Sequence, residues 1–209
     1  MKHFLAFAFS LFLAGLSSAV EPRTVLFFGD SLTAGHGLED VTTEAFPGII
    51  QGNITAAGLP YRVVNAGLSG ETTAGGLRRI DWILRMPVAV FVLELGGNDG
   101  LRGLPIGSSA KNLQGIIDKV RAKNPSVKVV VAGMKMPSNM GAYATEFASM
   151  YPSLARNNDA ALIPFLLEGV GGHPLLNQPD GIHPTAEGHK RIAETAWKAL
   201  RPLLEPVTR

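Results

Sequence analysis

Five short runs of apolar and β-branched residues place the strongest constraint on how this chain of 209 residues folds. The central runs are continuously apolar, as strands covered on both faces are. Longer segments of helical period separate the runs, a pattern typical of a parallel sheet wrapped by helices. The sequence therefore predicts an α/β domain whose strands span residues 24–28, 61–65, 88–95, 127–132 and 160–164.

Two of the intervening segments carry apolar stripes at helical spacing, which predict helices that pack on the sheet. The first stripe comprises Ala110, Leu113, Ile117 and Val120, behind candidate caps at Ser108 and Ser109. The second stripe comprises Ile192, Ala196, Leu200 and Leu203. Because proline suits the first turn of a helix and disrupts its interior, we expect the last helix to begin at Pro184 and to stop near Arg201 and Pro202.

The composition is that of one globular domain without a dominant electrostatic partner. Hydrophobic residues make up 46% and charged residues 17% of the chain, and the formal net charge is +2. The length suits one domain with a full core, and neither a repeat nor a linker divides it, so residues 20–209 are predicted to form a single domain. Lysine and arginine are scattered rather than clustered, which argues against a nucleic-acid partner.

The first 19 residues are typical of a signal peptide. Lys2 and His3 precede an apolar run over residues 4–16, and residues 17–19 place small side chains at the cleavage positions. We predict cleavage after Ala19, with no stable membrane insertion afterwards. An uncleaved anchor is the alternative, but the uncharged run is shorter than the ~20 residues that a helical span needs. The chain has no cysteine, which excludes disulfides and thiolate chemistry.

Polar and glycine-rich segments lie where the predicted strands end, which is where an open parallel sheet binds its ligands. The first strand leads into residues 29–32 (GDSL), the second into residues 65–71 (NAGLSGE) and the third into residues 96–100 (GGNDG). A fourth such segment, residues 180–184 (DGIHP), precedes the last predicted helix. We expect the functional site to form where these segments meet.

The four segments occur in the order of the four sequence blocks of the SGNH, or GDSL, hydrolase family, which the chain resembles over nearly all of its mature length. The strings FFGDSLTAGHGL, ELGGNDGLRG and DGIHP are similar to the bacterial thioesterase I, lysophospholipase L1 and arylesterase branch of that family. The resemblance implies a three-layer α/β/α sandwich with a flavodoxin-like central parallel sheet of about five strands. It also implies a serine hydrolase that needs no cofactor and no metal.

The resemblance and the chemistry of the side chains predict the same catalytic triad. A serine hydroxyl becomes an effective nucleophile when a base takes its proton, so Ser31 is the predicted nucleophile. His183 is the predicted base, since imidazole exchanges protons near neutral pH. Asp180 is predicted to bind His183 Nδ1, which leaves Nε2 facing Ser31 and stabilises the imidazolium once it forms.

The resemblance further predicts three donors for the oxyanion that forms when Ser31 attacks a carbonyl group. They are the backbone N–H groups of Ser31 and Gly70 and the side-chain amide of Asn98. Lack of a Cβ lets the backbone approach a ligand closely at Gly70. Gly67 is the alternative in the same loop, but Ser-Gly-Glu at Gly70 matches the Ser-Gly-Asp of the family, apart from one methylene in Glu71.

Several of these polar residues also have purely structural interpretations. Taken alone, Ser31 is a good cap for the helix that follows the first strand, and Asn98 is a good turn residue. We interpret Asp99 as a turn residue outside the catalytic set. We interpret Asp30 as a brace between loops rather than as an acid or base.

The remaining histidines discussed here, His36, His173 and His189, are interpreted as surface or loop residues. No pair of them has a metal-ligand spacing that nearby carboxylates support. The sequence therefore predicts no metal site.

The loops after the third and fourth predicted strands are the candidate substrate-binding segments. They span residues 101–106 and 134–140 and are rich in leucine and methionine, side chains that adapt to acyl chains of varied shape. Ordinary loop packing is the alternative. The candidate lining residues are Leu101, Leu104, Ile106, Met134 and Met136.

The predicted reaction is two-step acyl transfer through an acyl-enzyme on Ser31, and the predicted substrates are small molecules: medium or long acyl esters, aryl esters, thioesters or lysophospholipids. The alternatives are a carbohydrate O-deacetylase on the same fold and a catalytically inactive lipid- or sugar-binding protein. A nucleotide-binding module is disfavoured, because the chain has neither a G-x-G-x-x-G string after the first strand nor a phosphate-binding loop. We expect a monomer that is exported to the periplasm, with secretion from the cell as the alternative.

Overall fold

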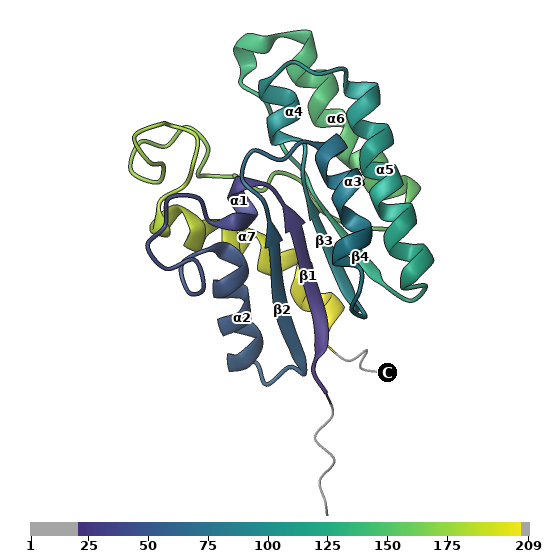
Figure 1. The fold of residues 1–209 in the computed structure, drawn as a ribbon. Coiled ribbons are helices and arrows are strands. Elements are labelled where there is room, and N and C mark those ends of the chain that lie inside the picture. The colour runs from purple at the N-terminus through teal and green to yellow at the C-terminus, as the bar shows by residue number, and fades with distance from the viewer. Residues whose placement is uncertain (1–20, 206–209) are drawn as a thin grey trace, which may run out of the picture.

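The structure, a computed structural model, describes residues 21–205. The predicted signal peptide lies outside the described residues. Within residues 21–205 the chain forms a five-stranded parallel sheet with helices on both faces (Figure 1), which confirms the predicted fold class. No helix in this range is both long and apolar enough to cross a lipid bilayer.

All five predicted strands are present, and their ends differ from the prediction by two residues at most. Nearly every side chain of β1 and β3 is buried. Helices cover both faces of these central strands, which explains why their sequences are continuously apolar. The strands are β1 (Arg23–Gly29), β2 (Tyr61–Gly67), β3 (Val90–Glu94), β4 (Lys128–Ala132) and β5 (Ala161–Ile163).

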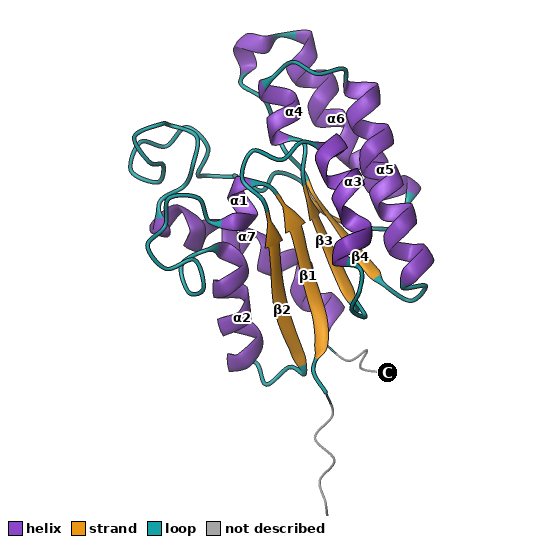
Figure 2. Cartoon of the chain, viewed as in Figure 1, coloured by secondary structure: helices purple, strands orange, loops and turns teal. Residues whose placement is uncertain are grey.

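Helices connect the strands and form the two outer layers (Figure 2). Helices α2 and α7 pack together on one side of the sheet, and α3 packs with α5 on the other side, with α6 next to α5. The helices are α1 (Ser31–Ala34), α2 (Phe46–Ala56), α3 (Thr73–Ile83), α4 (Gly97–Leu101), α5 (Ile106–Lys123), α6 (Ala142–Asn157) and α7 (Ala186–Leu204), and a short 3₁₀ helix covers Ser138–Met140.

The strand order β2-β1-β3-β4-β5 determines where the site lies. This is the flavodoxin-like order, in which the connections from β1 and β3 run in opposite directions. They leave a crevice beyond the carboxyl ends of these two strands, the usual position of ligands in open α/β sheets. Ser31 lies two residues beyond the end of β1 and Asn98 four residues beyond the end of β3, so both lie at this crevice.

The N-terminus of α5 differs from the prediction. The helix begins at Ile106, with Pro105 at the cap position, so Ser108 and Ser109 lie within the first turn and do not cap it. The Ser109 hydroxyl instead donates to Asp99 at 3.0 Å. The predicted apolar stripe of this helix does form core, since its members after the first are fully buried: Leu113, Ile117 and Val120.

Both ends of α7 also differ from the prediction. Thr185 caps the helix by accepting the Gly188 N–H at 3.3 Å, so the helix begins after Thr185 rather than at Pro184. At the other end the helix continues through Pro202 to Leu204. Leu204 is buried in the core, and the apolar contact it makes there stabilises a last turn that the proline alone would disfavour.

His189 is a core residue, which corrects its assignment to the surface. It lies on α7 and is 1% exposed. Its Nδ1 accepts the Phe46 N–H at 3.2 Å, and this amide, at the start of α2, has no acceptor within its own helix. Burial lowers the pKa of His189 to about 4, so the ring is neutral at physiological pH and its proton is on Nε2.

The buried His189 predicts a loss of stability in acid. As pH falls from 6.5 to about 4, the unfolded chain binds a proton at His189 that the folded chain does not bind, so the free energy of unfolding decreases across this window, by about 3 kcal/mol. The variant His189→Asn retains an acceptor for Phe46 but does not titrate. Urea unfolding at pH 7.5 and 4.5 should show a smaller decrease for the variant; equal decreases would contradict this role.

Candidate active site

Ser31 lies in the turn that links β1 to α1, which we call the Ser31 turn (residues 29–33). Asp30 caps α1, because its Oδ1 accepts the Leu32 N–H at 3.1 Å. The capping role considered for Ser31 therefore belongs to its neighbour. Ser31 is the first residue of the helix and lines a cavity at the crevice.

The side chains of Ser31, His183 and Asp180 form a continuous hydrogen-bonded chain. His183 Nε2 lies 3.0 Å from Ser31 Oγ, and His183 Nδ1 lies 2.7 Å from Asp180 Oδ2. These distances suit a nucleophile, a base and a carboxylate that orients the base. The structure thus brings together the three residues predicted as the triad, with Nε2 facing the serine.

Asp180 is fixed by the turn that it begins. Its Oδ1 accepts the N–H groups of Ile182 at 2.9 Å and His183 at 3.0 Å. Gly181, which lies between Asp180 and Ile182, has a φ of +70°, which glycine adopts without strain. The hydrogen bond from His183, followed by these backbone bonds, holds the pKa of Asp180 well below its usual range. The carboxylate is therefore ionised at neutral pH and stabilises a positive charge on His183.

Gln178 connects the Asp180 turn to the segment after α1. Its backbone N–H donates to the His183 carbonyl at 2.7 Å, and its side-chain amide donates to the His36 carbonyl at 2.7 Å. The rings of His36 and His183 lie 4.4 Å apart between centroids. These contacts tie the predicted base to the segment that follows α1, and no sequence motif indicated them.

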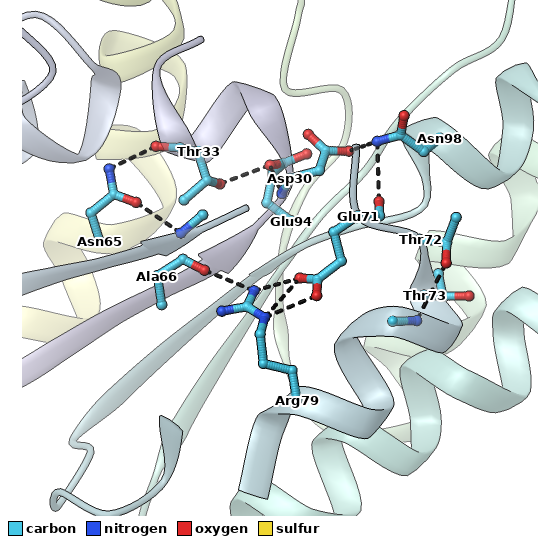
Figure 3. A network of polar contacts seen from close by, with 12 residues as sticks. Asp30, Thr33, Asn65, Ala66, Glu71, Thr72, Thr73, Arg79, Glu94 and Asn98 are labelled. Carbon is cyan, nitrogen blue, oxygen red and sulfur yellow. Dashed lines mark hydrogen bonds and ion pairs between the residues drawn. The ribbon is translucent and has the colours of Figure 1, made fainter. Parts of the chain in front are cut away.

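Asn98 lies between the loops that carry the other two predicted oxyanion donors. Its Nδ2 donates to Asp30 Oδ2 and to the Glu71 carbonyl, each at 3.1 Å (Figure 3). Asp30 precedes Ser31 and Glu71 follows Gly70. The Asn98 amide therefore contacts the sequence neighbours of both other donors, Ser31 and Gly70. Its side chain binds these loops and not its own backbone, as it would in a simple turn.

Gly70 and Gly67 are glycines for different reasons. Gly70 has a φ of +78°, a conformation that glycine adopts without strain, and a Cβ there would meet open space. Its backbone conformation therefore accounts for the glycine, and the close approach to a ligand at this position stays a prediction. Gly70 is the third residue of a turn closed by the Glu71 N–H, which donates to the Leu68 carbonyl at 3.1 Å. A Cβ on Gly67 would collide with the Ala34 backbone, so Gly67 is a packing residue.

Glu71 fixes the Gly70 loop to α3 (Figure 3). Its buried carboxylate pairs with Arg79, whose Nε donates to Glu71 Oε1 at 2.9 Å. Arg79 also donates to the Ala66 carbonyl at 2.9 Å and lies over the Phe28 ring, 4.3 Å from its centroid. Glu71, which has one methylene more than the aspartate of the family's Ser-Gly-Asp string, therefore has a structural role.

Asp99 is a buried brace, which corrects its interpretation as a simple turn residue. It is 2% exposed. Its carboxylate accepts the Thr73 N–H at 2.9 Å, the Thr73 hydroxyl at 2.6 Å and the Ser109 hydroxyl at 3.0 Å. These bonds join α4 to the first turns of α3 and α5, and so they fix the backbone next to Asn98.

Asp30 is a bracing residue, as interpreted from the sequence. It accepts hydrogen bonds from Leu32 and Asn98 and is 2% exposed. Burial raises its pKa to about 6, although both hydrogen bonds act in the opposite direction. Its contacts join the Ser31 turn to α4.

A cavity of about 260 Å³ opens beside Ser31 and His183. Three of the predicted substrate-binding residues line it, namely Leu101, Met134 and Met136. Met134 and Met136 are buried, whereas Leu101 is 50% exposed at the rim. The apolar wall suits an acyl chain.

Leu104 and Ile106 are not among the residues that line this cavity. The Leu104 carbonyl accepts the Tyr143 hydroxyl at 2.8 Å, which ties this segment to α6. Ile106 packs against the hydrophobic core at the start of α5. These contacts are those expected from the alternative of ordinary loop packing.

Much of the cavity wall comes from residues that the sequence did not single out. Most of them lie in the segments after β4 and β5, and the position of those segments beyond strand ends was the available signal. The segment between β5 and α7 has no apolar period that would have marked its inward-facing residues. The additional lining residues include Leu32, Lys135, Pro137, Leu167, Asn177 and Ile182.

Within the described range, no three His, Asp or Glu side chains are grouped so that they could hold a metal ion. His36 and His173 are exposed, as interpreted from the sequence. That the reaction needs no metal stays a prediction.

Comparison with known proteins identifies the family. Residues 27–191 match the GDSL-like Lipase/Acylhydrolase family. The chain is 40% identical to the esterase TesA of Pseudomonas aeruginosa over 196 residues, which cover 93% of this chain and 96% of the relative. It is 35% identical to thioesterase 1/protease 1/lysophospholipase L1 of Escherichia coli over 202 residues, which cover 96% of this chain and 93% of that protein.

Solved structures of esterases have the same fold. A crystal structure of TesA matches with a TM-score of 0.82 and 41% identity, covering 87% of this chain and 100% of the other. The esterase AlinE4, an SGNH-hydrolase family member, matches with a TM-score of 0.72 and 40% identity, covering 90% and 99% of the two chains. The chain therefore belongs to the GDSL-like lipase/acylhydrolase family, has the SGNH hydrolase fold and is a carboxylic ester hydrolase.

Proposed function

We propose that the enzyme hydrolyses acyl esters and thioesters through an acyl-enzyme on Ser31, with His183 as general base and Asp180 as its orienting partner. The observation that carries this proposal is the chain of hydrogen bonds from Ser31 Oγ through His183 to Asp180, with distances of 3.0 and 2.7 Å, beside an apolar cavity. The same arrangement performs acyl transfer on several unrelated folds.

The reaction proceeds in two steps. Ser31 Oγ attacks the carbonyl carbon while its proton passes to His183 Nε2, and the same nitrogen then returns that proton to the departing alcohol or thiol. Water next attacks the acyl-enzyme, with His183 as base, and releases the carboxylic acid and free Ser31. Asp180 stays ionised in both steps and stabilises the imidazolium.

The negative charge on the substrate oxygen is stabilised by the N–H groups of Ser31 and Gly70 and by the Asn98 amide. Asn98 supports this proposal because Asp30 and Glu71 fix the orientation of its Nδ2. An oxyanion shares the amide hydrogens with these two acceptors. Donors held in place before the reaction stabilise the transition state without reorganising.

The cavity favours esters with an apolar acyl group of medium or greater length. Most of its exposed wall is apolar and comes from leucine, isoleucine and methionine side chains, although Lys135 and Asn177 also line it. Aryl esters, thioesters and lysophospholipids all present an apolar group of this kind, and relatives are named for thioesterase and lysophospholipase activities. We therefore favour an acyl esterase over a carbohydrate deacetylase and over an inactive binding protein.

We also propose that residues 1–19 are a cleaved signal peptide and that residues 20–209 act as a single-domain monomer in the periplasm. The charged start, short apolar run and small residues at 17–19 support export. All three proposed triad residues belong to one chain and already contact one another, so a partner subunit is not needed to complete the triad.

Fluorophosphonate labelling tests the proposed nucleophile. This probe phosphonylates serines that a neighbouring base activates. For protein that begins at residue 20, we expect a single adduct on the peptide that contains Ser31, and no adduct with Ser31→Ala. An adduct on another serine, or none on the folded wild-type protein, would contradict the proposal.

The cavity rim predicts a change in acyl-chain preference. Leu101 and Ile182 line the cavity and are about half exposed, so shortening either removes apolar contact with little effect on the core. We expect Leu101→Ala and Ile182→Ala each to lower kcat/KM for p-nitrophenyl octanoate about fivefold relative to p-nitrophenyl acetate, equivalent to about 1 kcal/mol of lost contact.

Leu175→Ala is the matched control for these rim variants. Leu175 is 80% exposed and is not part of the cavity wall, so its octanoate-to-acetate ratio should equal that of the wild type. If all three variants keep the wild-type ratio, the acyl chain does not occupy this cavity.

A further inference from the structure

Glu94 is a buried acid next to the Ser31 turn. It belongs neither to the proposed triad nor to the proposed oxyanion donors. It is the last residue of β3, at the crevice between β1 and β3, and is 1% exposed. It begins the string that contains Asn98, but it is not one of the residues predicted for the site. A carboxyl group is seldom buried unless specific hydrogen bonds compensate it.

Glu94 contacts Asp30 and Thr33, which lie on either side of Ser31 in the sequence; Figure 3 shows Glu94 with these two neighbours. Its Oε2 accepts the Asp30 N–H at 3.2 Å and the Thr33 hydroxyl at 2.7 Å. Asp30 lies one residue before Ser31 and Thr33 lies two residues after it. One oxygen atom therefore fixes the backbone on one side of Ser31 and a side chain on the other side.

These two hydrogen bonds belong to a longer network around the Ser31 turn (Figure 3). The Thr33 carbonyl accepts the Asn65 side-chain amide at 2.7 Å, and Asp30 Oδ2 accepts the Asn98 amide. A Cβ on Gly29 would collide with the Glu94 carboxyl and the Thr33 hydroxyl. The network thus requires both the acid at position 94 and the absence of a side chain at position 29.

The surroundings of the Glu94 carboxyl disfavour its ionised form. Its Oε1 is buried and has no hydrogen-bond partner among residues 21–205, so an ionised group would be solvated by donors at one oxygen only. Burial, and then repulsion from Asp30, raises the pKa of Glu94 well above its usual range. A glutamine, which has nearly the shape of a protonated glutamate, is therefore the conservative replacement.

We propose that Glu94 is a positioning residue for acyl transfer: by accepting hydrogen bonds from Asp30 and Thr33, its Oε2 holds Ser31 Oγ within reach of His183. This inference rests on the proposed role of Ser31 as nucleophile. Glu94 touches neither the substrate nor the reacting atoms, and it acts through the geometry of the Ser31 turn. A misplacement of about 1 Å is enough to lower a rate about a hundredfold.

Glu94→Met and Glu94→Gln test the proposal, with p-nitrophenyl butyrate as substrate. Methionine has a similar length but leaves the Asp30 N–H and the Thr33 hydroxyl without their acceptor. We expect Glu94→Met to lower kcat about 100-fold with KM changed less than about threefold, and to slow fluorophosphonate labelling of Ser31 by a similar factor. Glu94→Gln keeps an acceptor oxygen, so it should retain kcat within about fivefold of the wild type.

Asn158→Leu is the control for lost stability. Asn158 is also buried (4% exposed) and hydrogen-bonded, but its partners are Gln114, Arg121 and Leu154, in α5 and α6. We expect both this variant and Glu94→Met to lower the melting temperature, and we expect Asn158→Leu to keep the wild-type kcat below that temperature.

Three outcomes would overturn the proposal. Glu94→Met with wild-type kcat would show that the two hydrogen bonds do not position Ser31. If kcat falls as far in Glu94→Gln as in Glu94→Met, the acidic group of Glu94, and not its hydrogen-bond acceptor oxygen, is what the reaction needs. If kcat falls equally in Asn158→Leu, the lower kcat of Glu94→Met is explained by lost stability alone. Activity in a parallel Ser31→Ala sample would instead refute the nucleophile assignment on which the inference rests.

Discussion

Ser31→Ala is expected to lower kcat/KM for p-nitrophenyl butyrate by about 10³-fold or more and to leave the fold intact. The hydroxyl is the group that forms the acyl bond, and alanine has no atom that can replace it. The remaining activity would come from the oxyanion donors acting on water that His183 activates. The measurement is a comparison of initial rates for the two proteins, each beginning at residue 20.

A matched serine control separates chemistry from general disturbance. Ser69 is exposed and precedes Gly70, so Ser69→Ala changes the same chemical group in the neighbouring loop but removes no triad atom. Its kcat/KM should stay within about twofold of the wild type, since exposed substitutions rarely disturb the fold. Equal losses in Ser31→Ala and Ser69→Ala, or wild-type activity in Ser31→Ala, would contradict the assignment of Ser31.

The parts of the site that the sequence predicted correctly are those set by local spacing or by strand ends. Asp180 and His183 are three residues apart in one turn, so their contact follows from a short segment of chain. Ser31 and Asn98 lie two and four residues beyond the ends of β1 and β3, and the order of a flavodoxin-like sheet brings those strand ends together. The apolar runs, separated by segments of helical period, were enough to place all five strands.

The residues that were misjudged are those whose partners are distant in the chain. His189 is buried because its ring accepts the Phe46 amide, 143 residues away, and nothing in the sequence around His189 indicates that partner. Asp99 was misjudged for the same reason, since its hydrogen-bond partners lie at the starts of two other helices. Polar residues flanked by glycines are common in turns, so local chemistry favoured the wrong interpretation.

The substrate cavity was predicted only in part for a related reason. Leu101, Met134 and Met136 follow β3 and β4 at the crevice, where the topology already places ligands. Leu167 and Ile182 belong to the long segment between β5 and α7, where neither helical nor strand period shows which side chains face inward. The contacts of Gln178 with His183 and His36 decide how this segment lies against the Ser31 side.

Asp180→Asn is the second variant with a large expected effect, because the amide reverses the hydrogen-bonding pattern at His183. In the wild type, Asp180 Oδ2 accepts from His183 Nδ1 while Oδ1 accepts two backbone amides. The asparagine oxygen is needed by those backbone donors, so its NH₂ group faces Nδ1 and favours the tautomer with the proton on Nε2. That tautomer cannot take the Ser31 proton, and we expect kcat to fall by about 10³- to 10⁴-fold.

The same replacement should have little effect on folding, which makes the kinetic result interpretable. The Asp180 side chain is 42% exposed, and asparagine still accepts the backbone amides of Ile182 and His183, so the melting temperature should stay close to that of the wild type. The variant Asp180→Glu, which remains an acid but is one methylene longer, should recover part of the lost kcat if the carboxylate reaches Nδ1 again. An asparagine variant with kcat within tenfold of the wild type would mean that His183 keeps its catalytic tautomer without Asp180, and the carboxylate would then be a structural residue of its turn.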